Sequence, residues 1–140
     1  MPAPLLCRKS AVNKAAKVQR GRHAEQRGRW AEIMCLVRLW LTGWRVIAHR
    51  LTGRRGSGLG EIDIIAKRGN VLAFIEVKAR NTLDAALESI SRTQQERIQA
   101  AAAQFVAHRP GYTDCQIRFD AMVLSSRAWP QHIADAWRPD

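Results

Sequence analysis

The chain has 140 residues, of which 46% are hydrophobic, and this suits a single domain with one core. It carries 23 lysines and arginines against 12 acids, a formal net charge of +11. Such a charge favours a polyanionic partner, nucleic acid before an anionic membrane, although a basic tail that only aids solubility is the alternative.

The three cysteines are odd in number and far apart, so we expect neither a disulfide framework nor a zinc site, and a reducing cytoplasm is the expected location. No run approaches the roughly 20 apolar residues of a membrane helix, so no membrane partner is expected.

Much of the positive charge lies near the N-terminus. Residues 1–30 contain eight lysines and arginines against one acid, Glu25, which gives +7 of the +11. Residues 1–21 show little apolar periodicity, so we expect a mobile basic arm there and a single α/β domain over residues 22–140.

The next stretch has the apolar spacing of a helix that ends at Gly43. The residues expected on its inward face are Trp30, Ile33, Met34, Val37 and Leu41. Only Arg38 is polar between positions 33 and 41, so we expect the helix to be largely buried. A strand is predicted over residues 44–51, and residues 52–60 form a glycine-rich cationic loop.

Residues 60–80 predict a β-hairpin. The Gly-Asn pair at positions 69 and 70 suits a two-residue turn, which makes Arg68 and Val71 the flanking pair. Counting outward, Asp63 lies opposite Glu76, and residue 61 lies opposite residue 78; a three-residue turn would shift this register.

The rest of the chain predicts one helix over residues 83–109, stopped by a Pro-Gly pair, and then a last strand over 115–126. The expected inward positions of that helix are Ile90, Ile98, Ala101, Ala102 and Phe105. Residues 132–137 are expected to make a short closing turn. The order of helix, three strands, helix and strand predicts an α/β fold, a mixed sheet of about four strands flanked by helices.

The charges inside the hairpin are unusual. Carboxylates directly across a strand pair come within about 5 Å and repel by roughly 3 kcal/mol at an effective dielectric near 20. A divalent cation between the two carboxylates replaces their repulsion with attraction to the cation, and Mg²⁺ binds through one or two carboxylates. Lys78, two residues after Glu76, points to the same side and could orient or deprotonate a water, or stabilise charge on a phosphate. The alternative is a solvated hairpin face with a Glu61–Lys78 salt bridge, and the spacing alone leaves both open.

Three stretches, GEIDIIA (60–66), FIEVKAR (74–80) and RFDAMVL (118–124), resemble signature blocks of the YraN family. These proteins are resolvase-like members of the PD-(D/E)XK nuclease superfamily, whose pattern is similar to Asp63 followed by Glu76 and Lys78. The resemblance implies an αβββαβ restriction-endonuclease-like core and Mg²⁺ or Mn²⁺ as cofactor. It also implies a further metal-binding acid at Glu32, for which a helix-start acid favoured by the helix dipole is the alternative. Glu25 is the competing candidate, but it lies in the polar stretch before the helix.

The resemblance implies roles for individual residues. Asp63, Glu76 and Glu32 would bind the metal, and Lys78 would assist the nucleophile. Contacts with nucleic acid are expected from the arginine pair at 54 and 55, from Arg80 and from Gln94. Gln94 or Gln95 could also lie near the metal, although a solvated helix face is the commoner environment. Asp120 is interpreted as structural.

Two functions are therefore expected. The first is a metal-dependent endonuclease acting on DNA, in particular on branched or Holliday-junction structures. The second is a non-catalytic nucleic-acid-binding protein that retains the nuclease fold and uses the basic arm for phosphate contacts and tryptophans for stacking, although the core is the commoner place for most of these tryptophans. Its candidate tryptophans are Trp30, Trp44, Trp129 and Trp137. The choice between DNA and RNA, and a homodimeric state, stay open.

Overall fold

The computed structural model describes residues 19, 28–49, 62–125 and 128–140. The chain divides into two compact units, Met1–Ile33 and Met34–Asp140. The expected basic arm lies almost wholly outside the described residues, and so do Arg54, Arg55 and Glu61.

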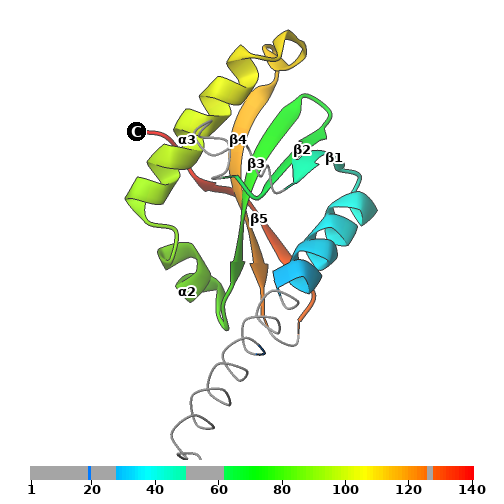
Figure 1. Cartoon of the computed structure of the whole chain (residues 1–140), viewed down its shortest axis with the longest axis vertical. Coiled ribbons are helices and arrows are strands. Elements are labelled where there is room, and N and C mark those ends of the chain that lie inside the picture. Colours follow the sequence, from blue (N-terminus) through cyan, green and yellow to red (C-terminus); the bar gives the residue numbers. More distant parts are fainter. Residues whose placement is uncertain (1–18, 20–27, 50–61, 126–127) are drawn as a thin grey trace, which may run out of the picture. The chain divides into compact units, whose positions relative to one another are not determined.

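The second unit is built on a five-stranded mixed sheet with the strand order β1-β2-β3-β4-β5 (Figure 1). The strands are β1 (Arg45–His49), β2 (Ile64–Arg68), β3 (Val71–Ala79), β4 (Gln116–Leu124) and β5 (Gln131–Trp137). Neighbouring strands are antiparallel except β3 and β4, which run parallel and are joined by a helical crossover. The crossover contains α2 (Leu83–Glu88), α3 (Arg92–Ala107) and the short 3₁₀ helix η2 (Pro110–Tyr112). The predicted α/β class, mixed sheet and αβββαβ core are confirmed.

The fifth strand corrects the prediction of about four strands and of a closing turn over residues 132–137. The pattern hid β5 because buried and exposed residues do not alternate along it: Ile133 is partly buried, and Ala134 and Asp135 are both exposed. Its register on β4 shifts between Phe119 and Ala121, and Asp135 has a positive φ of 54°. The backbone N–H of Asp135 donates to the buried Asp120 carboxylate at 2.9 Å, and this bond fastens the irregular strand to β4.

The β2–β3 hairpin has the predicted register. The pairs run from Arg68 and Val71 beside the turn to Ile64 and Ile75 at the other end. Gly69 has a φ of +58°, a conformation that glycine adopts without strain. The two-residue turn is therefore confirmed.

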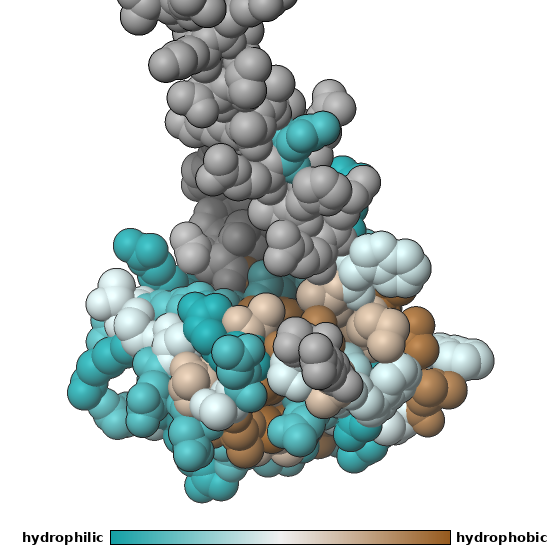
Figure 2. Space-filling view, turned by 90° about the horizontal axis from the view of Figure 1, so that it is seen from below, coloured by the Kyte–Doolittle hydropathy of each residue, from teal (hydrophilic) through white to brown (hydrophobic). Residues whose placement is uncertain are grey.

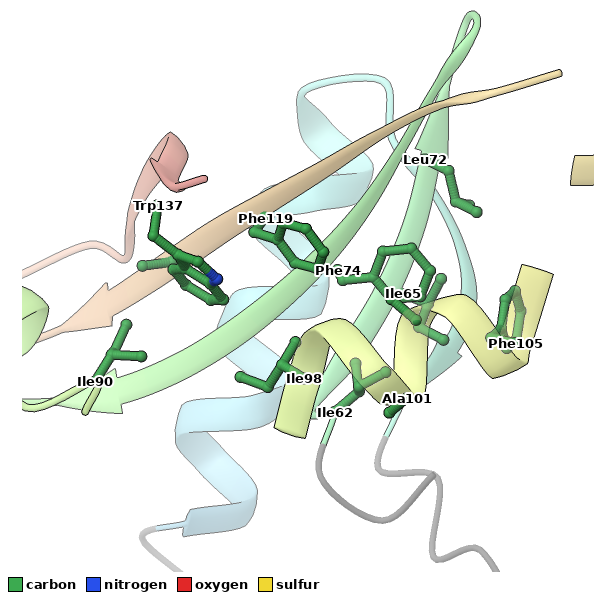
Figure 3. Packing of buried hydrophobic residues seen from close by; sticks show 12 residues of the cluster. Ile62, Ile65, Leu72, Phe74, Ile90, Ile98, Ala101, Phe105, Phe119 and Trp137 are labelled. Atoms are coloured by element: carbon green, nitrogen blue, oxygen red, sulfur yellow. The ribbon is translucent and has the colours of Figure 1, made fainter. Parts of the chain in front are cut away.

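Each face of the sheet is covered by an apolar cluster. On one face α3 packs against β2, β3 and β4 through residues that include Phe74, Phe105 and Ile98 (Figure 3). On the other face Cys35 and Leu39, from the helical residues 34–41, pack with Trp44 and the opposite side chains of the hairpin. The five predicted inward positions between Ile90 and Phe105 are at most 4% exposed, which confirms that prediction.

The single helix expected over 83–109 is wrong, because the chain forms α2 and α3 with a break between them. Ser91 is the N-cap of α3, and its side chain accepts from the Gln94 N–H at 3.2 Å. A serine followed three residues later by glutamine is the pattern of a capping box, and here it starts a new helix.

The helix over residues 28–41 also differs from the expectation. The exposed fraction is 39% for Val37 and 62% for Leu41, whereas Cys35 and Leu39 are fully buried. Trp30 and Ile33, which lie in the first unit, are exposed by 67% and 49%. The predicted inward face was therefore wrong, because apolar residues surround the helix and the spacing did not show which of them meet the sheet.

The end of this helix is as predicted. Gly43 has a φ of +83°, its N–H donates to the Trp40 carbonyl at 3.1 Å, and the Trp44 N–H donates to the Leu39 carbonyl at 2.9 Å. These two bonds form a Schellman motif, which requires a left-handed residue after the helix. Among the described residues no helix is long and apolar enough to cross a membrane.

Candidate functional site

Four polar side chains gather where β3 ends beside the first turn of α3: Asp63, Glu76, Lys78 and Gln94. We call them the carboxylate–lysine site. Asp63 comes directly before β2, and its Oδ2 accepts the backbone N–H of Val77 at 2.8 Å. This bond ties the first carboxylate to the strand that carries the second.

Glu76 is the centre of the contacts. Its side chain is buried, with 5% of the residue exposed, although a carboxylate is costly to bury. Its Oε1 lies 3.0 Å from the Lys78 Nζ and accepts from the Gln94 Nε2 at 2.5 Å. Lys78 in turn donates to the Gln94 Oε1 at 3.2 Å. Glu76, Lys78 and Gln94 therefore form a closed triangle of polar contacts.

Burial and the nearby Asp63 raise the pKa of Glu76 from 4.5 to about 7. Burial is the largest cause, the negative charge of Asp63 is the next, and a side-chain hydrogen bond with Asp63 adds to them. Lys78 opposes the change through its hydrogen bond and its positive charge, but it does not cancel it. Near neutral pH the Glu76 carboxyl is therefore close to half protonated, and a cation at the site would displace that proton.

The chemistry of this site fits a hard divalent cation. Two carboxylates on neighbouring strands are the number that magnesium sites commonly use, with waters and substrate oxygens completing the shell. Within the described parts of the chain no group of three or more His, Cys, Asp or Glu residues gathers in a way that could hold a metal. Metal binding by Asp63 and Glu76 therefore stays a prediction.

The other predicted site residues lie apart or elsewhere. Glu32 belongs to the helical residues of the first unit, whereas Asp63 and Glu76 belong to the second, so its role as a ligand stays a prediction. Arg80 is exposed just beyond β3, where its Nη1 donates to the Ala79 carbonyl at 2.8 Å. Its contact with nucleic acid also stays a prediction.

Gln94 does not have the solvated environment that we considered the commoner one. It is half-buried and bonds to both Glu76 and Lys78. The sequence did contain a signal for this: the N-cap at Ser91 makes position 94 the third residue of a helix that starts beside the end of β3.

Asp120 is the second buried acid, and its contacts are separate from the carboxylate–lysine site. Arg118 donates to it through Nε and Nη2, both at 2.8 Å, and the His132 Nε2 lies 2.7 Å from its Oδ2. Burial would raise the pKa of Asp120, but the hydrogen bonds from His132, Arg118 and the Asp135 N–H outweigh it and hold this pKa below 3.8. The contacts join β4 to β5, as a structural role requires.

Fold and site together define an α/β domain whose mixed sheet carries two neighbouring carboxylates and a lysine at the end of a central strand. The model of the family described as "Uncharacterised protein family UPF0102" matches residues 31–124. The chain belongs to this family, which is the YraN family that the sequence blocks resemble.

Relatives with the same family name match most of the chain. A UPF0102 protein of Paramagnetospirillum magneticum, amb4503, is 43% identical over 129 residues, which is 92% of this chain and all of that protein. A UPF0102 protein of Parvibaculum lavamentivorans is 43% identical over 119 residues, which is 85% of this chain and 86% of that protein.

One comparison is with a solved structure, that of Hjc, a Holliday junction resolvase from Archaeoglobus fulgidus. It aligns with a TM-score of 0.47 and 22% sequence identity over 74% of this chain and 72% of that one. A likeness of this size says nothing about which reaction the present chain performs.

Proposed function

We propose that this protein is a metal-dependent endonuclease that hydrolyses phosphodiester bonds in DNA, with branched structures such as Holliday junctions as its substrate class. The observation that carries the proposal is the buried Glu76 carboxyl beside Asp63, with the Lys78 amine 3.0 Å away. Two acids that repel each other and raise a pKa destabilise the folded chain, and a divalent cation would relieve the repulsion.

Each residue of the site has a role in this proposal. Asp63 and Glu76 would hold Mg²⁺ or Mn²⁺, with Glu32 as a third ligand. A bound cation would polarise the phosphodiester and lower the pKa of a water molecule. Lys78 would orient that water or stabilise negative charge on the phosphate, and Gln94 would hold the Glu76 and Lys78 side chains in place.

The choice of DNA rests on charge and on motif. The net charge of +11 favours a polyanion that contacts phosphates without reading their sequence. The arginine pair at 54 and 55, together with Arg80, would supply such contacts. The spacing of Asp63, Glu76 and Lys78 resembles that of nucleases of the PD-(D/E)XK superfamily.

The test is cleavage of a labelled four-way junction with Mg²⁺ or Mn²⁺. We expect the wild-type protein to cut, and we expect Asp63→Ala and Lys78→Ala each to abolish cutting. Asp84→Asn and Lys67→Ala are the matched controls, since each removes the same charge from a residue outside the site, and they should keep the activity. Cutting in EDTA, or cutting that survives both site changes, would contradict the proposal.

A non-catalytic nucleic-acid-binding protein is the second candidate. It is favoured by one observation: Lys78 and Gln94 already satisfy the Glu76 Oε1 within the protein. Calorimetry separates the two functions. Millimolar Mg²⁺ or Mn²⁺ should bind the wild-type protein and not Asp63→Ala if the site is catalytic, and should bind neither if the protein only holds nucleic acid.

A further inference from the structure

A patch of large apolar side chains is exposed on the second unit, and the carboxylate–lysine site does not use it. Val37, Trp40 and Leu41 are exposed by 39%, 73% and 62%, and we call them the tryptophan patch. Their spacing of three and four residues puts them on one face of the helix. In Figure 2 hydrophobic side chains reach the surface among hydrophilic ones, including on the side where Figure 1 draws this helix.

The opposite side of the same helix packs against the sheet. Cys35 and Leu39 are fully buried in the core, so they fix the rotation of the helix on the sheet. Trp40 must therefore point away from the sheet. Single exposed apolar residues are ordinary, whereas apolar side chains exposed side by side, as here, are the feature of contact surfaces.

A positioned arginine lies at the same end of the helix. Arg68, from the end of β2, donates through Nη1 to the Thr42 carbonyl at 3.1 Å, and its guanidinium carbon lies 4.8 Å from the centre of the Trp44 ring. It is exposed, and no acid pairs with it in the part of the chain that the structure describes. The neighbouring described sequence is also basic, because residues 33–49 contain two arginines and no aspartate or glutamate.

We propose that Trp40 is a stacking platform for an unpaired base of single-stranded nucleic acid, and that Arg68 holds a phosphate of the same strand. The inference rests on the proposed function in taking nucleic acid as the partner. Every base has a π-face for an exposed indole, and aromatic residues beside cations are the usual means of holding single strands.

Charge argues against the other occupants of the patch. A second copy of the chain would bring together two molecules of net charge +11, each with an exposed Arg68 near the patch. An anionic membrane suits the arginines, but three apolar side chains bury little area in a bilayer. A single strand needs one aromatic face and one phosphate contact, and the described surface offers both.

The patch is separate from the carboxylate–lysine site. Glu76 bonds to Gln94 of α3, whereas Arg68 lies over Trp44 on the opposite face of the sheet. Val71, the strand partner of Arg68, is five residues from Glu76 along β3, about 17 Å at the usual rise per residue. Binding at the patch can therefore be measured without the chemistry of the site.

The test is the affinity for a fluorescent oligothymidylate and for an abasic strand of the same length, by anisotropy in EDTA. Trp40→Ala should weaken binding of the oligothymidylate about 5- to 100-fold and leave the abasic strand unchanged, because only bases stack. Trp40→Phe should stay near wild type, whereas Trp40→Leu should bind as weakly as Trp40→Ala. Leu83→Ala, which shortens an exposed apolar side chain on α2, is the control and should change nothing.

Salt dependence tests the role of Arg68. Arg68→Gln should reduce the slope of log affinity against log salt by about 0.7, the value for one phosphate of a single strand. Trp40→Ala should leave this slope unchanged, because stacking releases no counterions.

Three results would overturn the inference: equal losses on the abasic strand, full binding by Trp40→Leu, or a Trp40→Ala effect seen only on anionic vesicles or on dimer formation in sedimentation. Its failure is distinct from failure of the proposed function. Junction cleavage that requires Asp63, with normal strand binding by Trp40→Ala, would remove only the platform. A Trp40 effect in a protein that never cuts DNA would remove only the nuclease.

Discussion

Changing Glu76 to glutamine should make the metal-free protein more stable at alkaline pH. The neutral amide has nearly the shape of a protonated carboxyl. Unlike the ionised carboxylate, it carries no charge that must be buried or that repels Asp63. Burial and Asp63 raise the pKa of Glu76 from 4.5 to about 7. At about 1.36 kcal/mol for each pH unit, this difference corresponds to about 3 kcal/mol.

The sign of the pH dependence follows from this pKa. Between pH 4.5 and about 7 the folded protein holds a proton on Glu76 that the unfolded chain releases. The contribution of Glu76 to the free energy of unfolding therefore falls as the pH rises through this range, and it is lowest above pH 7. The Glu76→Gln variant lacks this loss.

The assay is urea unfolding of wild type and Glu76→Gln in EDTA from about pH 5 to about pH 8, the range over which the linkage acts. The variant should be near the wild type in stability at the acid end and more stable by up to about 3 kcal/mol at the alkaline end. Glu88→Gln changes an exposed acid of α2 in the same way and should show no such trend. A difference between wild type and Glu76→Gln that is constant with pH, or that grows toward acid, would refute the reasoning.

Magnesium should reduce this difference in stability between the wild type and Glu76→Gln. A cation that binds only the folded protein stabilises it by an amount that grows with the logarithm of its concentration above the dissociation constant. The wild type should gain stability with Mg²⁺ above pH 7, where Glu76 is ionised, and the Glu76→Gln variant should gain less. The same unfolding curves, repeated with the chelator replaced by Mg²⁺, measure this difference.

Three further changes test other parts of the structure. Asp120→Asn should destabilise the protein by about 3 kcal/mol, because it removes the buried carboxylate that pairs with Arg118 and accepts from the Asp135 N–H. Since the pKa of Asp120 is held below 3.8, this loss of stability should be constant above that pH and shrink only below it. Urea unfolding measures the loss, and an unchanged stability would show that the contacts of Asp120 do not hold β5. Gly43→Ala should lower the free energy of unfolding by about 1 kcal/mol, because a residue with a side chain is strained at a φ of +83°. Gly111→Ala is the control in thermal unfolding, since Gly111 has open space around it and no positive φ. Equal effects of the two changes would contradict the strain. Gln94→Ala should weaken Mg²⁺ binding in calorimetry by more than Gln99→Ala, which changes a glutamine five residues further along α3. Equal affinities would remove the positioning role of Gln94.

Periodicity and turn chemistry predicted the parts of the fold that depend on near neighbours. The turn at Gly69 fixed the hairpin register, and through it the position of Asp63 beside Glu76, because pairing in a tight hairpin follows from the loop length. The inward face of α3 was equally visible, since Ile98 and Phe105 stand among polar residues that cannot be buried.

Periodicity failed where both choices were apolar or where a side chain decided the backbone. The helix over 28–41 has apolar residues all round, so only packing on the sheet selected Leu39 and left Trp40 outside. The break between α2 and α3 depends on one capping bond from Ser91, in a stretch whose composition is helical throughout. Strand β5 depends on Asp120, whose partners are 12 and 15 residues away in the chain.

The candidate site likewise contains residues that local rules place and one residue that they do not. Its two acids and its lysine come from one hairpin, so local rules place them. Gln94 arrives from another element, 18 residues from Glu76, and only the path through α2 and the cap at Ser91 bring its amide to the Glu76 carboxylate. The amide donates to Glu76 and accepts from Lys78, so it orients the acid and the amine at once. A chain that kept the hairpin but displaced the start of α3 would keep the acids and the lysine and lose this geometry, and we therefore expect activity to depend on the cap as well as on the charged residues.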